Sequence, residues 1–315
     1  MPGWLESPVH AGDGYPDPRM LTALFVLARI VANPVSNVFQ KRLAQRAANP
    51  VFIIGATHAL LTLAALPFVA GARPLELGAA FWANMVICAV LAVTGNVLLV
   101  YALRSSDLSI LGPINAYKAV LSLALGVFLI GEVPTAFGLA GVLLILVGSY
   151  FVVDRAPDQS HGNAFMQFLR ERGVRLRFAA LAFSATEAVF LKRAVLHSSP
   201  VITFLFWSIL GLPIAAAAIT LLLRGSVGQE TLRLRHHWRT YLWLAITTGL
   251  MQLTTLLTFG RLQVGYSLAL FQLSTLISVF LGYRYFQERS IRRRLFGSAV
   301  MVAGAALIVA LGRRG

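Results

Sequence analysis

Long apolar runs alternate with short polar segments along almost the whole chain. A helix needs about 20 mainly apolar residues to cross a hydrocarbon core of about 30 Å, and ten runs meet or approach that length. The pattern therefore predicts an all-α integral membrane protein with ten transmembrane helices. We expect these helices at residues 20–40, 50–70, 79–103, 108–131, 135–153, 176–195, 200–223, 239–259, 265–287 and 292–311.

The second half of the chain repeats the first. The segment Leu108–Tyr150 aligns with Val264–Ala306 at a shift of 156 positions, so that Glu132 meets Glu288. In a membrane protein, two copies of a repeat with an odd number of spans lie in opposite orientations. We therefore expect two inverted five-helix repeats.

A shorter repeat marks the start of each half. The sequence VFQKR at 38–42 resembles VFLKR at 189–193, each closing a first helix, and Pro50 and Pro200 then open the next one. The polar stretch between the halves is the linker. The segments expected are a disordered tail at 1–19, a first five-helix repeat at 20–153, a linker loop at 154–175 and a second five-helix repeat at 176–311, with the two repeats forming one transport unit.

Composition supports a membrane protein. Hydrophobic residues make up 57% of the chain, charged residues make up 12%, and the mean hydropathy is +0.74, which excludes a soluble domain. The net charge of +15 does not indicate nucleic-acid binding, because the basic residues lie at helix ends, where they meet anionic lipid headgroups. Membrane lipids are therefore expected partners and nucleic acid is not. The single Cys88 cannot form an internal disulfide.

The closing segment of each repeat carries a signature. An apolar fourth helix ends in LIGE at 129–132 or YFQE at 285–288, and a glycine-containing fifth helix follows a short turn. With its two five-span repeats, the chain over residues 20–311 resembles the drug/metabolite transporter superfamily, and within it the EamA-like transporters. This resemblance implies secondary transport, with export favoured, through a cavity lined by spans one, three, four, six, eight and nine. It leaves the substrate open.

Three charged residues lie near the middle of predicted helices, namely Arg29, Lys118 and Glu187. A charge at the bilayer centre costs about 2.5–3.5 kcal/mol on insertion scales, so such residues normally face protein or a water-filled cavity. Two cations against one anion favour an anionic or zwitterionic solute. Arg29 would bind its carboxylate, phosphate or sulfate in a bidentate manner, and Lys118 would act as a point charge. Glu187 is a proton-coupling candidate, a counter-ion for Lys118 or a ligand for a cationic substrate.

Uncharged polar residues extend these positions along one helix face. In the first span they recur every three to four positions from Arg29 to Gln40, which places them on one side of a helix. The alternative is that such groups only join helix to helix. The substrate-binding residues that we expect are Arg29, Asn33, Asn37, Asn115, Tyr117, Lys118, Glu187, Gln252 and Gln272.

Four further polar or aromatic residues have structural interpretations. We expect His58 to be a hydrogen-bonded packing residue, and Glu132 and Glu288 to cap or anchor turns at span ends. Trp207 would either line the cavity or pack between helices.

Other functions are alternatives to metabolite transport. Efflux of cationic drugs would make Glu187 the central carboxylate. A membrane enzyme acting on a lipid-linked phosphate would need acidic, His or Cys clusters at the membrane surface, whereas His236 and His237 have no adjacent carboxylates. We therefore expect no enzyme activity, no cofactor and no metal site. A non-transporting receptor would have no reason for the polar faces.

The expected location is a bacterial inner membrane. Two arguments disagree on the orientation of the protein in that membrane. Most basic residues lie on the side opposite the termini, so the positive-inside rule places both termini outside. Resemblance to the family places them inside. The partner expected is a small-molecule substrate, and the sequence leaves the coupling ion and the oligomeric state open.

Overall fold

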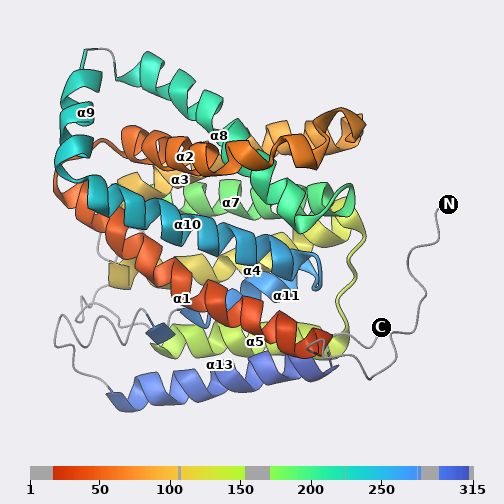
Figure 1. Ribbon diagram of the computed structural model, residues 1–315. Coiled ribbons are helices and arrows are strands. Elements are labelled where there is room, and N and C mark those ends of the chain that lie inside the picture. Colours follow the sequence, from red (N-terminus) through yellow and green to blue (C-terminus); the bar gives the residue numbers. More distant parts are fainter. Residues whose placement is uncertain are drawn as a thin grey trace.

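The computed structural model describes residues 17–105, 108–152, 171–223, 225–274, 276–277 and 291–311. In the helix that begins at Leu108, side chains are described from Tyr117 onward. Every regular element in this part of the chain is a helix (Figure 1). The α-helices are α1 (Pro18–Gln45), α2 (Pro50–Ala65), α3 (Ala79–Ser105), α4 (Leu108–Ile130), α5 (Ala136–Val152), α7 (Arg172–Leu196), α8 (Pro200–Leu222), α9 (Val227–His236), α10 (Trp238–Phe259), α11 (Val264–Phe271) and α13 (Ile291–Leu311).

The lengths and composition of these helices identify an integral membrane protein. In the described part of the chain, five helices are long and apolar enough to cross a membrane, at Arg19–Gln45, Pro50–Phe68, Ala79–Ser105, Pro200–Leu222 and Trp238–Phe259. Shorter apolar helices lie at Tyr117–Ile130, Ala136–Ser149 and Ala299–Ile308. Each of the ten predicted spans contains a described helix.

Several helix bounds differ from the prediction. Helix α7 begins at Arg172, four residues before the expected span and inside the expected linker, because helical hydrogen bonding continues into the polar residues at the membrane surface. Helix α11 ends at Phe271, although the apolar run predicted a span over 265–287. Residues 275 and 278–287 of that run lie outside the described residues, as do Glu288, residues 1–16 of the expected tail and residues 154–170 of the expected linker.

Some helices were not expected at all. Three 3-10 helices, η1 (Leu66–Phe68), η2 (Ala70–Ala72) and η3 (Pro74–Glu76), join α2 to α3. Helix α9 is short and polar, which is why a search for apolar runs missed it.

The predicted helix starts at the two prolines are confirmed. Asn49 caps α2 by accepting the N–H of Val51, and Ser199 caps α8 by accepting the N–H of Ile202 at 3.2 Å. In each case proline occupies the first helical position, where the missing N–H costs no hydrogen bond.

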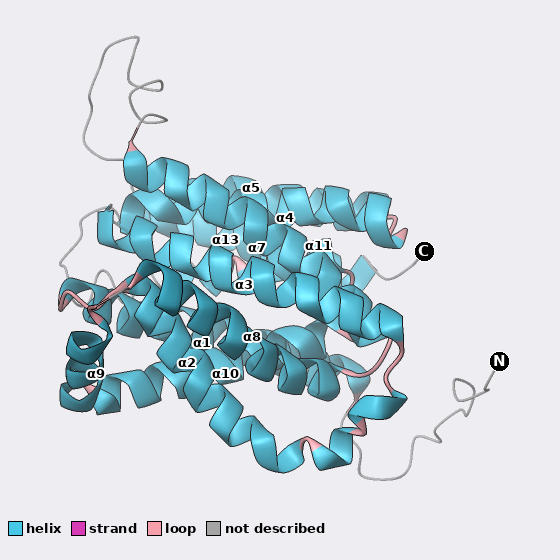
Figure 2. Cartoon of the chain, turned by 90° about the horizontal axis from the view of Figure 1, so that it is seen from above, coloured by secondary structure: helices cyan, strands magenta, loops and turns pink. Residues whose placement is uncertain are grey.

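The bundle has two ends, which we name by their contents. At the basic end, the α1–α2 turn contacts α9, since Arg233 donates to Ala47 O at 2.8 Å and Asn49 N–H donates to Glu230 Oε2 at 3.1 Å. At the opposite end, which we call the clamp end, the guanidinium of Arg261 lies 5.3 Å from the ring centroid of Phe25 in α1. Helix α1 therefore runs from the clamp end to the basic end. In Figures 1 and 2, α9 lies across one end of the bundle.

Helices of the first half pack on helices of the second half. The pairs include α1 with α10, α2 with α8, α3 with α7, α4 with α11, and α5 with α13. The α5–α13 pair packs closely through its glycines, because a Cβ at Gly148 would lie 2.6 Å from Gly297 O and one at Gly304 would lie 2.6 Å from Gly141 O. Small residues let helix backbones approach closely in a membrane.

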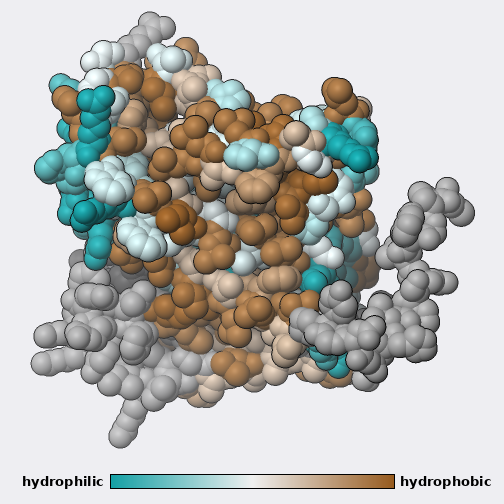
Figure 3. Space-filling model, in the orientation of Figure 1, coloured by the Kyte–Doolittle hydropathy of each residue, from teal (hydrophilic) through white to brown (hydrophobic). Residues whose placement is uncertain are grey.

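The surface separates apolar from polar residues along the helix axes. Figure 3 shows a broad apolar face over the middle of the bundle and hydrophilic residues gathered toward its two ends. This is the distribution required of a protein whose sides meet lipid and whose ends meet water.

Candidate functional site

Three charged residues predicted to lie within the membrane come together between the two halves. Lys118 of α4 interacts electrostatically with Glu187 and Arg177 of α7 and with Arg29 of α1. Lys118 is half-buried, and Glu187 is only 7% exposed. This charged cluster contains three cations and one anion, because Arg177 joins the three residues expected from the sequence.

An aromatic donor holds the carboxylate of Glu187. Trp207 of α8 donates its Nε1–H to Glu187 Oε1 at 3.1 Å. The ring centroid of Trp207 lies 4.8 Å from that of His58, whose Nδ1 is 3.3 Å from Ser208 O. Among the described residues no cation lies within 4.0 Å of the Glu187 carboxylate. Trp207 thus orients Glu187 without neutralising it, and His58 is the hydrogen-bonded packing residue that the sequence predicts.

Arg29 reaches across from α1 to the second half. Its Nε–H donates to Thr255 Oγ1 at 2.7 Å, and its guanidinium carbon lies 4.9 Å from the ring centroid of Phe271. Its Nη1 is buried and has no hydrogen-bond partner among the described residues. Leaving a buried donor unsatisfied costs about 1–3 kcal/mol, and more for a charged group. Arg29 is therefore oriented by protein contacts and still has a donor to offer a ligand.

The polar face of α1 lies against α10 in a defined antiparallel register. Arg29 pairs with Thr255, and the hydroxyls of Ser36 and Thr248 are 2.9 Å apart. These two bonds are seven residues apart on each helix, so Gln252 lies between them. Gln252 is buried, and its Nε2 has no partner among the described residues. A second unsatisfied donor therefore lies beside Arg29 along the same interface.

The remaining predicted site residues fall into different surroundings. Asn33 Nδ2 donates to Ser274 Oγ at 3.3 Å, Asn37 is half-buried on α1, and Gln272 is buried at the end of α11. Tyr117 is 59% exposed. It lies on the outer face of α4, away from the charged cluster, because residues adjacent in a helix point in different directions. The side chain of Asn115 lies outside the described residues.

Sequence reasoning missed three residues that shape the cluster. Arg177 lies at the start of the expected span 176–195 and had been counted with the basic residues of the membrane surface. Thr255 was not among the expected binding residues, and its partner Arg29 is 226 positions away in the chain. The role of Trp207 was left undecided between cavity lining and packing, and its hydrogen bond to Glu187 was not expected.

A second charged cluster closes the clamp end. Lys192 Nζ donates to Phe259 O and, at 3.1 Å, to Leu262 O, which lie at the end of α10 and in the turn that follows. It also lies 3.6 Å from Glu132 Oε1, while Glu132 Oε2 accepts the N–H of Val264, the first residue of α11, at 2.8 Å. Glu132 therefore anchors a turn, as expected, but the turn belongs to the other half of the chain.

Neighbouring contacts reinforce this clamp. The backbone N–H of Thr135 donates to the hydroxyl of Tyr266 at 2.8 Å, and Gln263 Nε2 donates to Val133 O at 3.1 Å. The α4–α5 turn is thus bound to α11 and to the turn that precedes it.

Comparison with known proteins agrees with this architecture. Among solved structures, a crystal structure titled only "Crystal structure of protein" matches 94% of this chain and 99% of its own chain, with a TM-score of 0.70 and 18% sequence identity. At this identity the match shows a shared fold and nothing about activity. No curated protein matches the chain.

The family comparison confirms the recognition made from the sequence. The model of the EamA-like transporter family matches residues 20–154, and this family is one of transporters rather than enzymes. Its members bind small-molecule substrates and reside in lipid membranes. Residues 20–154, which hold the first five of the ten predicted helices, thus match the EamA-like transporter family of the drug/metabolite transporter superfamily, in a chain whose helices are those of a membrane protein.

Proposed function

We propose that the protein is a secondary transporter that moves a small anionic or zwitterionic metabolite across a bacterial inner membrane, in the direction of export. The observation that carries this proposal is the charged cluster between the halves, in which Lys118 interacts electrostatically with the carboxylate of Glu187 and with the guanidinium groups of Arg29 and Arg177. Because Lys118 and Arg29 outnumber the carboxylate of Glu187, the cluster in its low-dielectric interior gains most from a ligand that brings negative charge.

The chemistry of the donors favours a carboxylate, phosphate or sulfate group. Arg29 has a buried Nη1 without a partner among the described residues, and a guanidinium presents its donors in a fork that matches two anion oxygens. Gln252 adds an amide donor on the neighbouring helix. Lys118 would complete the site as a point charge, and Asn33, Asn37, Asn115 and Gln272 would contact the uncharged part of the substrate.

The proposed transport unit is a pair of inverted five-helix repeats around this site. Support comes from the packing, which stays the same when the halves are exchanged: α1 packs on α10 as α7 packs on α3, and α2 and α8 pack on each other. Such symmetry is the basis of alternating access, in which one repeat moves against the other around a central site.

The clamp end would be the closed side of the cycle in the conformation described. The ion pair of Lys192 with Glu132 joins the first half to the second, and the site can open to this side only if those contacts break. Glu187 is the candidate for proton coupling, because it is the single acid in the cluster and lacks a direct ion pair among the described residues.

A second candidate substrate is a lipophilic cation. The observation that favours it is the pairing of Glu187 with the indole of Trp207 beside His58, because a carboxylate next to an aromatic face is suited to a cation. In that case the protein would be a drug exporter, and Lys118 would be the counter-ion of Glu187 in the empty site.

Ligand-induced thermal stabilisation of the purified protein tests these candidates. Wild type and Lys118→Gln are compared with amino acids, organic acids, sugar phosphates, nucleotide sugars and cationic dyes. A ligand at 100 times its dissociation constant stabilises the folded state by about 2.7 kcal/mol. The control is Lys41→Gln, which removes the same charge near the end of α1, away from the cluster.

The outcomes separate the proposals. Stabilisation by an anion that is lost in Lys118→Gln and kept in Lys41→Gln supports the anion site. Stabilisation by cationic dyes alone, kept in both variants and lost in Glu187→Gln, would replace it with the drug-export proposal. Anion stabilisation that is equal in all proteins would show that the anion binds elsewhere.

A further inference from the structure

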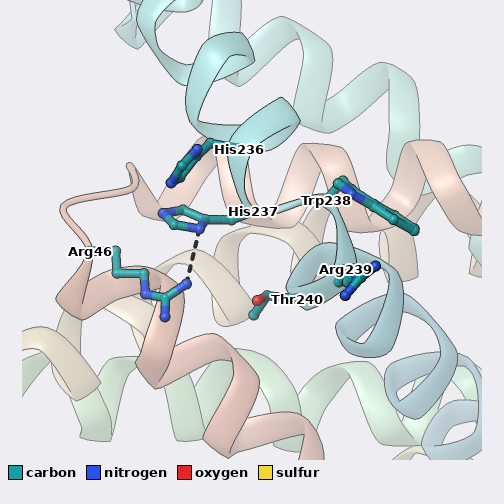
Figure 4. Close-up of a pocket in the computed structure, with 6 residues that line it drawn as sticks. All are labelled: Arg46, His236, His237, Trp238, Arg239 and Thr240. Carbon is teal, nitrogen blue, oxygen red and sulfur yellow. Dashed lines mark hydrogen bonds between the residues drawn. The ribbon is translucent and has the colours of Figure 1, made fainter.

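A hollow of about 380 Å³ lies at the basic end, between the two halves of the chain. Figure 4 shows Arg46, just after α1, on one side, and the α9–α10 junction from His236 to Thr240 on the other. None of these residues belongs to the charged cluster or to the clamp. The hollow is therefore separate from both the charged cluster and the clamp.

The lining of the hollow is cationic. It consists of Arg46, His236, His237, Trp238, Arg239 and Thr240, with no acidic side chain. Arg46 Nη1 lies 2.9 Å from His237 Nδ1. A guanidinium can only donate, so His237 Nδ1 accepts and the imidazole is neutral. Partial burial and the nearby charges of Arg46 and His236 also lower the pKa of His237.

The acidic residue nearest in sequence to the lining residues is already hydrogen-bonded elsewhere. Glu230 of α9 is 3% exposed, and it accepts the N–H of Asn49 and the guanidinium of Arg233. Arg233 in turn donates to Ala47 O at 2.8 Å. Because these contacts satisfy Glu230 away from the hollow, no acidic side chain among the described residues forms an ion pair with Arg46 or Arg239.

Exposed aromatic residues place the hollow at the membrane surface. Trp238 is 52% exposed, and the guanidinium carbon of Arg239 lies 5.4 Å from its ring centroid. Tryptophan is enriched where hydrocarbon meets the headgroup layer. Helix α9 lies across the ends of the other helices (Figure 1), as expected for a polar helix at the interface. The hollow is therefore at the depth of lipid phosphates.

An exposed apolar stripe leads from the hollow toward the bilayer centre. Trp243, Ile246 and Leu250 of α10 are all largely exposed, and their spacing of three and four residues places them on one face of the helix. That face starts near Arg239. A molecule with a phosphate in the hollow and acyl chains along α10 would match both surfaces.

We propose that the hollow binds a phosphate group, and that its source is the headgroup of an anionic phospholipid in the leaflet at the basic end. Arg46 and Arg239 provide forked donors for phosphate oxygens, and His236 and the Thr240 hydroxyl add hydrogen bonds. Because Arg46 belongs to the first half and Arg239 to the second, the bound lipid bridges the halves and stabilises the conformation described.

The test is a lipid titration of the purified protein in detergent, in which the melting temperature of the protein is measured at each lipid concentration. The probes are dioleoyl phosphatidylglycerol, dioleoyl phosphatidylcholine as a zwitterionic lipid, and inorganic phosphate as a soluble anion. The variants are Arg46→Gln and Arg239→Gln. The matched control is Arg235→Gln, which removes one positive charge from exposed α9 without touching the lining of the hollow.

We expect phosphatidylglycerol to raise the melting temperature of the wild type. The phosphatidylglycerol concentration that gives half of this rise should increase about fivefold in Arg46→Gln and Arg239→Gln, since each cation near an anionic surface contributes about 1 kcal/mol. Arg235→Gln should remain close to wild type. Stabilisation by inorganic phosphate alone, with the same sensitivity, would overturn the lipid source but keep the phosphate site. An equal loss in all three variants, or no stabilisation by either probe, would overturn the proposal.

Discussion

The ammonium of Lys192 in α7 lies 3.6 Å from Glu132 Oε1 in the α4–α5 turn, so this ion pair joins the two halves of the chain beside the turn between α10 and α11. Both side chains are almost buried, at 10% and 13% exposed. The two residues lie far apart in the chain, and each also bonds to the backbone of that turn. The pair is therefore a nearly buried link between the halves that is reinforced by backbone hydrogen bonds at this end.

Breaking the clamp should destabilise the protein. We expect Lys192→Met and Glu132→Gln each to lower the free energy of unfolding by about 3–5 kcal/mol, because each leaves a buried charge without its partner. The double variant should lose clearly less than the sum of the two single losses. Thermal unfolding of the four proteins measures this coupling, and additive losses would mean that the pair contributes nothing.

The indole N–H of Trp207 should matter through Glu187. Trp207→Phe keeps an aromatic ring and removes the donor, so we expect a loss of about 1.5–3 kcal/mol in unfolding free energy, as for a hydrogen bond to a charged group. The same change in a Glu187→Gln background should cost less, because the acceptor is then neutral. Thermal unfolding measures both effects. An equal cost in both backgrounds would show that Trp207 acts by packing alone.

Arg29 should be required as an arginine. Arg29→Lys keeps the charge but loses the Nε bond to Thr255 and the forked donors, so we expect the apparent affinity for the anion to fall about tenfold, or about 1.4 kcal/mol. Thr255→Val tests the positioning of Arg29 separately and should give a smaller loss. Ligand titrations by thermal shift measure both, and unchanged affinity in Arg29→Lys would remove the bidentate role.

The glycines between α5 and α13 should not tolerate a methyl group. A Cβ at Gly148 would lie 2.6 Å from Gly297 O, so we expect Gly148→Ala to destabilise the protein by about 1–3 kcal/mol through overpacking. The control is Gly71→Ala, since a Cβ at Gly71 meets nothing within 4 Å. Melting temperatures in detergent distinguish the two, and equal stability of both variants would contradict this packing.

The basic end should face the cytoplasm. Arg42, Arg46, Arg104, Arg172, Arg175, Arg235 and Arg239 are all exposed near this end, and Lys/Arg bias sets the orientation of membrane proteins. The thiol of Arg172→Cys should therefore be shielded from an impermeant reagent in intact cells. Labelling without permeabilisation would instead place the termini inside, as resemblance to the family implies. The only native cysteine, Cys88, is buried and gives little background.

The sequence predicted the elements better than their contacts. Proline and its preceding cap at 49–50 and 199–200 gave the starts of α2 and α8, because capping depends on neighbours in the chain. The start of α7 was misplaced, since apolar counting follows the lipid boundary and helices continue beyond it. Helix α9 was missed for the same reason, and with it the hollow beside Arg46.

By itself the sequence determined that the chain is a helical membrane protein and that Arg29, Lys118 and Glu187 are charges within its predicted helices, while the internal repeat and the resemblance to a family indicated transport. Apolar length, helical period and the cost of a buried charge are local properties, which neighbouring residues suffice to reveal. Only the tertiary structure decided that Trp207 orients Glu187, that Arg177 joins the cluster and that Lys192 binds Glu132. These contacts link residues from different helices, and the packing of one helix on another is set by side-chain shape that no local pattern records.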